Sequence, residues 1–522
     1  MRIRTRGGKI ADRAGGPEDG FRDPGHRADG TGSGGHRRGQ APRAASGTPT
    51  AAIALSAVGA LALAASTLLA ARGVESLRTW YFQAAWYSTI ALLDGGLALR
   101  TGRSPLLRRP RFALSLFFWS APTWYVFELL NLRMADWYYV FVPASLPLRW
   151  AGVIAAFATV LPALYLAHRW MASLGLARGW SRPRFTVRRR HYAACVILGA
   201  VFLVLSLWRP DAFFPLIWGA ATLLLEPFNH ARDPTTSLLG DLSRGSWTRI
   251  VRLLAGGAAI GLLWEGFNAL AGARWIYTVP GLEHLKLFEM PLPGFLGFPV
   301  FALDGFVIYH ALAHLGAAVP GWTTADVAEG PAAGGERAAV RSPSRGPRLR
   351  PSRAVPAVLV ALAFCAAVQS GVDRLTIDST APRVSDLPGL PRPALERLRA
   401  AGGEDARDLA EADPGELARR AGLPEAEART AVRAARLASL RGLGTVNAGA
   451  LWKGGVRSVC ELASSASARV RALVRAVRDD PRAGRPARVR VWLRAAREAC
   501  PGGGGGRAAT GGRSDGADLD RD

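Results

Sequence analysis

Cysteine is scarce in this chain of 522 residues, which holds only four, at positions far apart in the sequence. So few and so scattered, they exclude a disulfide-rich scaffold and a zinc cluster. Cys195 and Cys365 fall in apolar runs, where we expect them to pack as small core residues. The sequence leaves open whether Cys460 and Cys500 meet, which matters only in an oxidising compartment.

Acidic residues are in the minority, with 40 Asp and Glu against 66 Lys and Arg and a formal net charge of +26. This excess does not by itself indicate nucleic-acid binding, because the arginines lie mostly between apolar runs, where they would set membrane topology. A hydrophobic content of 49% is high for a soluble chain of this length. The composition predicts a membrane protein.

Residues 1–50 have hardly an apolar cluster, so we expect a disordered tail there. From Ala51 the chain predicts an all-α transmembrane bundle over 51–317, because apolar stretches of about spanning length follow one another. The eight expected spans are 51–71, 80–99, 112–131, 150–168, 192–208, 212–228, 250–271 and 295–317. Residues 355–371 form a weaker ninth candidate, either a span or a re-entrant segment.

Basic residues assign the two sides of the bundle. Alternate connections carry the arginines, which by the positive-inside rule places them and the N-terminus in the cytoplasm. These connections contain Arg100, Arg103, Arg108, Arg109 and Arg111, then Arg188, Arg189 and Arg190, then Arg232, Arg244, Arg249 and Arg252. The intervening connections at 132–149 and 272–294 are rich in Trp, Tyr and Pro, which favours the outer face of a bacterial inner membrane.

One motif occurs twice on that outer side. Each copy has a glutamate and an asparagine at i, i+3 at the end of an apolar helix, followed by a Trp-x-Tyr segment. Intramembrane carboxylates are expensive, so matched copies predict a shared polar and aromatic pocket. Its expected residues are Glu128, Asn131, Trp137, Tyr139, Glu265, Asn268, Trp275 and Tyr277, with Glu289 and Asp304 nearby.

This motif has three interpretations. Glu128 and Glu265 are the candidate catalytic residues of an enzyme, since a buried carboxyl can act as a general acid, for example on an isoprenoid double bond. In the second interpretation, each Glu and Asn pair caps its helix end and hydrogen-bonds the Trp or Tyr of the following loop, which we call a clasp. In the third, the residues form a transport or ion site. His310 and His314 share a helix face and could bind a metal ion. The sequence shows no third ligand at the spacing of a metal site, so we predict no metal or cofactor.

The region after the bundle predicts a flexible linker at 318–354, a small helical domain at 384–497 and a disordered tail at 498–522. The helical domain contains a repeat, with Leu387 to Leu390 matched by Leu440 to Leu443. The second copy has the Gly-Leu-Gly pattern of a helix-hairpin-helix, whose turn can bind phosphate. Gly442, Gly444 and Lys453 are therefore weak nucleic-acid candidates, against a plain protein-interaction module.

Residues 384–497, through these paired hairpins and the closing segment Val491 to Ala496, resemble a bacterial tandem helix-hairpin-helix domain family of undetermined function. The membrane half, through the segments 131–139 and 288–299, resembles a group of uncharacterised bacterial multi-spanning proteins. Both resemblances imply an architecture and no established activity.

The sequence thus predicts an inner-membrane protein with an outer-facing pocket that binds or acts on a lipid or isoprenoid. A small-molecule or ion transporter and a membrane-anchored DNA-binding protein are the alternatives. The expected partners are the lipid bilayer, such a lipid or isoprenoid ligand, and a protein or nucleic acid at the C-terminal domain.

Overall fold

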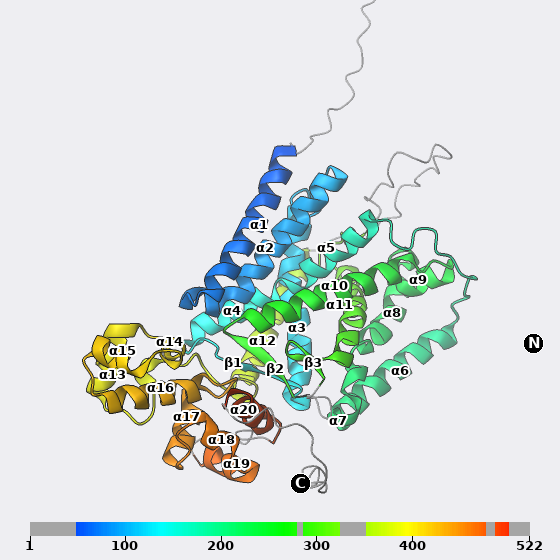
Figure 1. Ribbon diagram of the computed structural model, residues 1–522. Coiled ribbons are helices and arrows are strands. Elements are labelled where there is room, and N and C mark those ends of the chain that lie inside the picture. Colours follow the sequence, from blue (N-terminus) through cyan, green and yellow to red (C-terminus); the bar gives the residue numbers. More distant parts are fainter. Residues whose placement is uncertain (1–48, 279–284, 324–350, 477–485, 501–522) are drawn as a thin grey trace, which may run out of the picture. The chain divides into compact units, whose positions relative to one another are not determined.

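The computed structural model describes residues 49–278, 285–323, 351–476 and 486–500 (Figure 1). Most of the tails predicted at 1–50 and 498–522, and most of the linker predicted at 318–354, lie outside these residues. The described parts of these segments are 49–50, 318–323, 351–354 and 498–500. The predicted all-α class is confirmed, because nearly all described elements are helices.

Six of the described helical segments are long and apolar enough to cross a membrane. They are Thr50–Ala71 in α1 (Pro49–Ala71), Leu146–Ser173 spanning α4 (Leu146–Phe157) and α5 (Val160–Ser173), Arg189–Trp208 as α6, Thr248–Leu270 as α10, Leu292–His314 spanning η3 (Leu292–Leu296) and α11 (Gly297–His314), and Pro351–Leu375 as α12. The most apolar windows of α1 and α6 are only 11% buried by the protein. Exposed apolar surface on this scale is compatible with helices that face lipid.

The remaining predicted spans have a different outcome. Helices α2 (Glu75–Thr101) and α3 (Pro110–Met134) form where predicted but are not among the six apolar segments. The span predicted at 212–228 is not one helix: α7 (Pro210–Phe213), η1 (Phe214–Ile217) and α8 (Ala220–Arg232) replace it. Pro215 lacks an amide donor, and Gly219 adopts a left-handed φ of 92° before α8, so the helix is interrupted at both positions.

Short strands join the ends of the two motif-bearing helices. Strand β1 (Trp137–Val140) follows α3, strand β2 (Arg274–Tyr277) follows α10, and the two pair antiparallel (Figure 1). A second ribbon pairs β3 (Lys286–Leu287) with β4 (Met290–Pro291). Between α8 and α10 lie η2 (Pro234–Thr236) and α9 (Leu238–Ser243).

The C-terminal domain repeats a helical unit. Its elements are η4 (Val384–Asp386), α13 (Arg392–Gly402), α14 (Ala406–Ala410), α15 (Pro414–Ala421), α16 (Glu425–Ser439), α17 (Gly444–Lys453), α18 (Val459–Ala463), α19 (Ser467–Arg475) and α20 (Pro486–Ala499). Helices α18 and α19 begin 53 residues after α14 and α15, from Ala406 to Val459 and from Pro414 to Ser467. This offset is the one between Leu387 and Leu440, so the sequence repeat corresponds to repeated helices.

The membrane half and the C-terminal domain have separate apolar cores. A third, small cluster lies between them, formed by Tyr138, Val140, Phe141, Ile276 and Val491. The β1–β2 ribbon therefore contributes its outward face to the contact with α20.

Candidate functional site

Asn131 fastens the start of β1 to the last turn of α3. Its Oδ1 accepts hydrogen bonds from the amides of Asp136 (2.9 Å) and Trp137 (3.3 Å), and its Nδ2 donates to the Trp137 carbonyl (2.9 Å). The intervening Ala135 ends the helix in the left-handed region, at φ 60°. A left-handed residue at the end of α3 lets the chain turn into β1 within a few residues.

Asn268 performs the same task at the end of α10. Its Oδ1 accepts from the Trp275 amide (3.0 Å) and its Nδ2 donates to the Trp275 carbonyl (3.0 Å). Both asparagines are fully buried, where a backbone group without a partner would cost free energy. The duplicated motif thus forms two matched clasps between a helix end and a strand.

The two glutamates accept hydrogen bonds from the aromatic residues of these strands. Glu128 Oε1 accepts from the Trp124 indole (2.9 Å), the Trp137 indole (3.0 Å) and the Tyr139 hydroxyl (2.6 Å). In the second copy, the Tyr277 hydroxyl donates to Glu265 Oε1 at 2.9 Å. Burial, and next the neighbouring carboxylates, raise the pKa of both tyrosines well above the usual range, so their hydroxyls stay protonated and donate.

Pairing of β1 with β2 brings the two copies together. Trp137 lies opposite Tyr277, and Tyr139 lies opposite Trp275. Because side chains alternate along a strand, these four share one face, and Tyr138 and Ile276 take the other. The structure therefore places the eight motif residues in one region.

An aromatic cavity lies beside this face, with a free volume of about 100 Å³. Trp137, Tyr139, Trp275 and Tyr277 line it together with side chains of α2, α3, α4, α10 and α11. The further aromatic members are Trp80, Phe82, Trp124, Phe157, Trp218, Trp264, Phe298 and Phe301. Neither Glu128 nor Glu265 lines the cavity. The two carboxylates accept hydrogen bonds from aromatic residues of its wall without being part of its lining.

Two other predicted pocket residues lie apart from this cavity. Glu289 forms ion pairs with Arg441 of the C-terminal domain and with Arg274 (3.7 Å). Asp304 accepts from the amides of Gly219 (2.8 Å) and Thr222 (2.8 Å) at the start of α8. Asp304 therefore caps a helix, and Glu289 belongs to the contact between the two halves.

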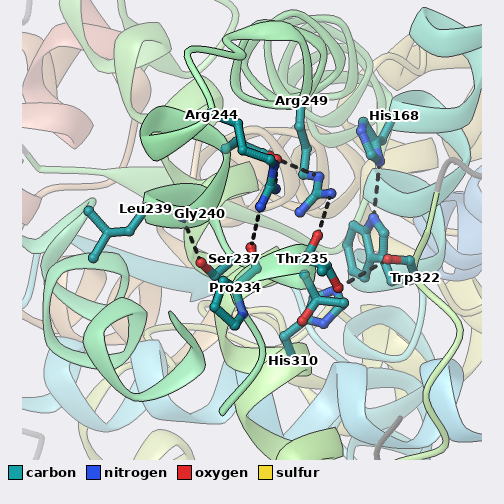
Figure 2. Close-up of polar contacts among 12 residues, drawn as sticks. His168, Pro234, Thr235, Ser237, Leu239, Gly240, Arg244, Arg249, His310 and Trp322 are labelled. Atoms are coloured by element: carbon teal, nitrogen blue, oxygen red, sulfur yellow. Dashed lines mark hydrogen bonds and ion pairs between the residues drawn. The ribbon is translucent and has the colours of Figure 1, made fainter. Parts of the chain in front are cut away.

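A partly buried polar network occupies another part of the bundle, between α5, η2, α9, α10 and α11 (Figure 2). The Trp322 indole donates to His168 Nδ1 (3.2 Å), and His310 Nε2 lies 3.1 Å from the Trp322 carbonyl. Arg249 pairs with Asp241 (3.2 Å) and donates to the Thr235 carbonyl (3.0 Å). His310 is thus a hydrogen-bonded contact, and the described residues contain no group of three ligands that could hold a metal ion.

The predicted phosphate-binding turn faces the membrane half. Gly442 and Gly444 are buried at positive φ (79° and 72°). A side-chain carbon at Gly442 would meet Val140 (3.1 Å) and Ile276 (3.2 Å) of the β1–β2 ribbon. Lys453 is exposed at the other end of α17. The turn is therefore a packing surface for the ribbon.

Sequence reasoning missed several residues of the site. Trp124 lies one turn before Glu128 and donates a hydrogen bond to it. Their i, i+4 spacing could have predicted this contact. Arg149 lines the cavity and pairs with Asp373 of α12 at 3.0 Å, a contact across 224 positions that no local pattern reveals. Cys460 and Cys500 form a disulfide that ties α18 to the end of α20.

Comparisons with known proteins add no relative: no family model, no curated protein and no solved structure matches this chain.

Proposed function

We propose that this chain is a multi-spanning protein of a bacterial inner membrane that binds the apolar end of a membrane-resident ligand, a lipid or an isoprenoid. The aromatic cavity is the observation that carries the proposal. Ligand sites are concave and largely apolar, and aromatic faces attract unsaturated chains and rings. An apolar cavity of about 150 Å³ can hold benzene, so about 100 Å³ suits one branched unit of a longer chain.

Binding is favoured over acid catalysis and over ion transport by the position of the carboxylates. Glu128 is fully buried, and one of its oxygens is taken by three donors. A general acid must reach the reacting atom, yet both glutamates stand behind the wall of the cavity. The clasp interpretation explains every hydrogen bond that these carboxylates make.

The proposal also places the C-terminal domain outside the cytoplasm, with the N-terminus inside. A disulfide joins Cys460 to Cys500, and disulfides persist in oxidising compartments. The domain contacts the connection at 272–294, which the positive-inside rule assigns to the outer face, through the ion pair of Arg441 with Glu289. Helix α12 then crosses the membrane as a further span.

The helix-hairpin-helix turn has a role within this arrangement. Gly442 packs against the β1–β2 ribbon and Gly444 against Ser379, so a nucleic acid could reach the turn only after these contacts separate. We therefore include no nucleic-acid binding in the proposal, and assign the repeat to docking on the outer end of the bundle.

Filling the aromatic cavity tests the binding site. Val153 lines it from α4, while Ala151 is an exposed residue on the same helix. We expect Val153→Trp to weaken binding of the isoprenoid alcohol geranylgeraniol at least about tenfold, a free-energy change of about 1.4 kcal/mol, and Ala151→Trp to leave it unchanged. Quenching of tryptophan fluorescence in nanodiscs would measure both. Equal binding by the two variants would overturn the proposed site.

Sidedness is tested by single cysteines in a background with Cys195→Ser and Cys365→Ser. Glu425 is exposed in the C-terminal domain and Arg103 is exposed in a predicted cytoplasmic connection. A membrane-impermeant maleimide should label Glu425→Cys in spheroplasts and should label Arg103→Cys only after lysis. The reverse pattern would place the C-terminal domain in the cytoplasm.

A further inference from the structure

A second cavity adjoins the aromatic one and contains a carboxyl group. Its free volume is about 360 Å³, within the range of ligand sites. It shares six lining residues with the aromatic cavity: Trp137, Trp218, Tyr277, Met290, Gly294 and Gly297. The rest of its wall is apolar apart from Asp136, which is the only charged side chain that lines it within the described residues.

Asp136 is 6% exposed, and its Oδ2 atom accepts no hydrogen bond from any residue that the structure describes. Glu128 and Glu265 also leave one oxygen without a donor, but neither of them lines this cavity or the aromatic one. By contrast, the carboxylate of Asp94, which is 2% exposed, accepts on both oxygens, from the Ser104 hydroxyl (2.5 Å) and the Leu106 amide (3.0 Å). A buried carboxyl oxygen without a donor is unfavourable, and a ligand in the adjoining cavity can supply the donor that Asp136 lacks.

The local backbone holds Asp136 in this position. Ala135, immediately before it, adopts a left-handed φ of 60°, which disfavours any residue with a β-carbon. The Asn131 side chain then fixes the Asp136 amide, and the Asp136 carbonyl accepts from the Thr278 amide at 2.8 Å. Strained positions that the surroundings fix in this way concentrate at functional sites.

The walls of the cavity favour a cation as the missing donor. The Trp137 indole N–H is already bonded to Glu128, so the ring offers its surface, and Trp218 and Phe214 add further aromatic rings. Aromatic faces attract ammonium groups. Asp211, an exposed carboxylate within electrostatic reach of Asp136, increases the negative potential.

We propose that the second cavity binds an amphiphilic amine, with Asp136 as the counter-ion of the ammonium group and the apolar wall around the chain. The site is independent of the ligand proposed for the aromatic cavity, because Val153 and the α2 and α4 side chains that line the aromatic cavity do not line this one.

Octylamine and octan-1-ol test this assignment, because they share a chain and differ in charge. Isothermal titration of the detergent-solubilised full chain should give an affinity for octylamine about tenfold or more above that for octanol. In Asp136→Asn the preference should disappear, while octanol binding stays the same. Asp136→Glu, which keeps the charge, should retain the preference even if Asp136→Asn fails to fold.

Asp211→Asn is the matched control, since it removes the same charge outside the cavity. We expect it to change octylamine affinity by less than about threefold, as for a screened surface charge.

A lipid headgroup or a free amine could be the source of the ammonium group. If it is a headgroup, octylamine should bind more weakly in nanodiscs of phosphatidylethanolamine than in those of phosphatidylglycerol; equal affinity indicates a free amine. Undiminished preference for octylamine in Asp136→Asn, or no binding by the wild-type chain, would overturn the site.

Discussion

Buried acidic residues in this protein have different roles because their immediate partners differ. Glu128 receives three side-chain donors, Asp304 caps a helix, and Asp378 pairs with Arg488 at 2.6 Å. Asp136, one residue beyond the cap of α3, has no donor on Oδ2 within the described chain; Oε2 of Glu128 also lacks one, but Asp136 lines a cavity and Glu128 does not. Burial, followed by repulsion from Asp211, raises the pKa of Asp136 to about 7.

This shift predicts the pH dependence of stability. Because the folded pKa of Asp136 lies above the unfolded value of about 3.9, the folded state binds the extra proton, and stability falls as pH rises from about 4 to about 7. The loss is roughly 4 kcal/mol at most. Asp136→Asn should remove this part of the dependence and raise the thermal midpoint at pH 8, measured in detergent. An unchanged pH profile in the variant would contradict the assignment.

At the scale of elements, the two helix ends and the β1–β2 ribbon form a single unit. Alternation along the ribbon sends Trp137 and Tyr277 toward the aromatic cavity and Ile276 toward the C-terminal domain. Glu128 connects α3 to this ribbon, so its role is structural and its removal should loosen the wall of the cavity.

Truncation at Glu128 measures the strength of the clasp. Glu128→Ala leaves the donors of Trp124, Trp137 and Tyr139 buried without an acceptor, which should lower the free energy of unfolding by roughly 3 kcal/mol. Glu128→Gln keeps one acceptor oxygen and should cost roughly 1 kcal/mol. Leu129→Ala, at the exposed neighbour, is the control. Equal stability of the alanine variants in denaturant titrations would argue against a clasp.

At the scale of the whole molecule, a buried ion pair fixes the C-terminal domain to the membrane half. The side chains of Arg488 and Asp378 are 4% and 0% exposed, and Arg488 also donates to the Leu375 carbonyl (3.2 Å) and lies over the Tyr138 ring. On the same helix, Arg494 pairs with Glu498 at 2.9 Å, with both side chains largely exposed. The buried pair of Arg488 and Asp378 therefore fixes the contact between the two halves, whereas water screens the exposed pair of Arg494 and Glu498.

Removing each arginine in turn separates these contributions. Arg488→Ala leaves Asp378 buried without its cation, so we expect a loss of about 3–5 kcal/mol and faster hydrogen exchange in β1 and β2. Arg494→Ala should cost less than about 1 kcal/mol. Equal exchange in the two variants would mean that the ion pair does not hold the domain in place.

Much of the candidate site followed from local spacing. The i, i+3 Glu and Asn pairs and the Trp-x-Tyr segments predicted two related clusters, because helix and strand periodicities determine which side chains share a face. Glu289 and Asp304 were included for their polarity alone, and their partners Arg441 and Gly219 lie far away in the sequence. Polarity identifies a buried group without identifying its partner.

The sequence by itself determined the all-α class, the position of most of the apolar helices, the repeat of the C-terminal domain and the duplicated motif, because these depend on composition and on spacing over a few turns. Only the tertiary structure decided that the carboxylates stand behind the aromatic cavity, that Asp136 faces a second cavity, that Cys460 bonds to Cys500 and that the Gly442 turn packs on the ribbon. Each depends on which distant segments meet, and that is set by packing across the whole chain.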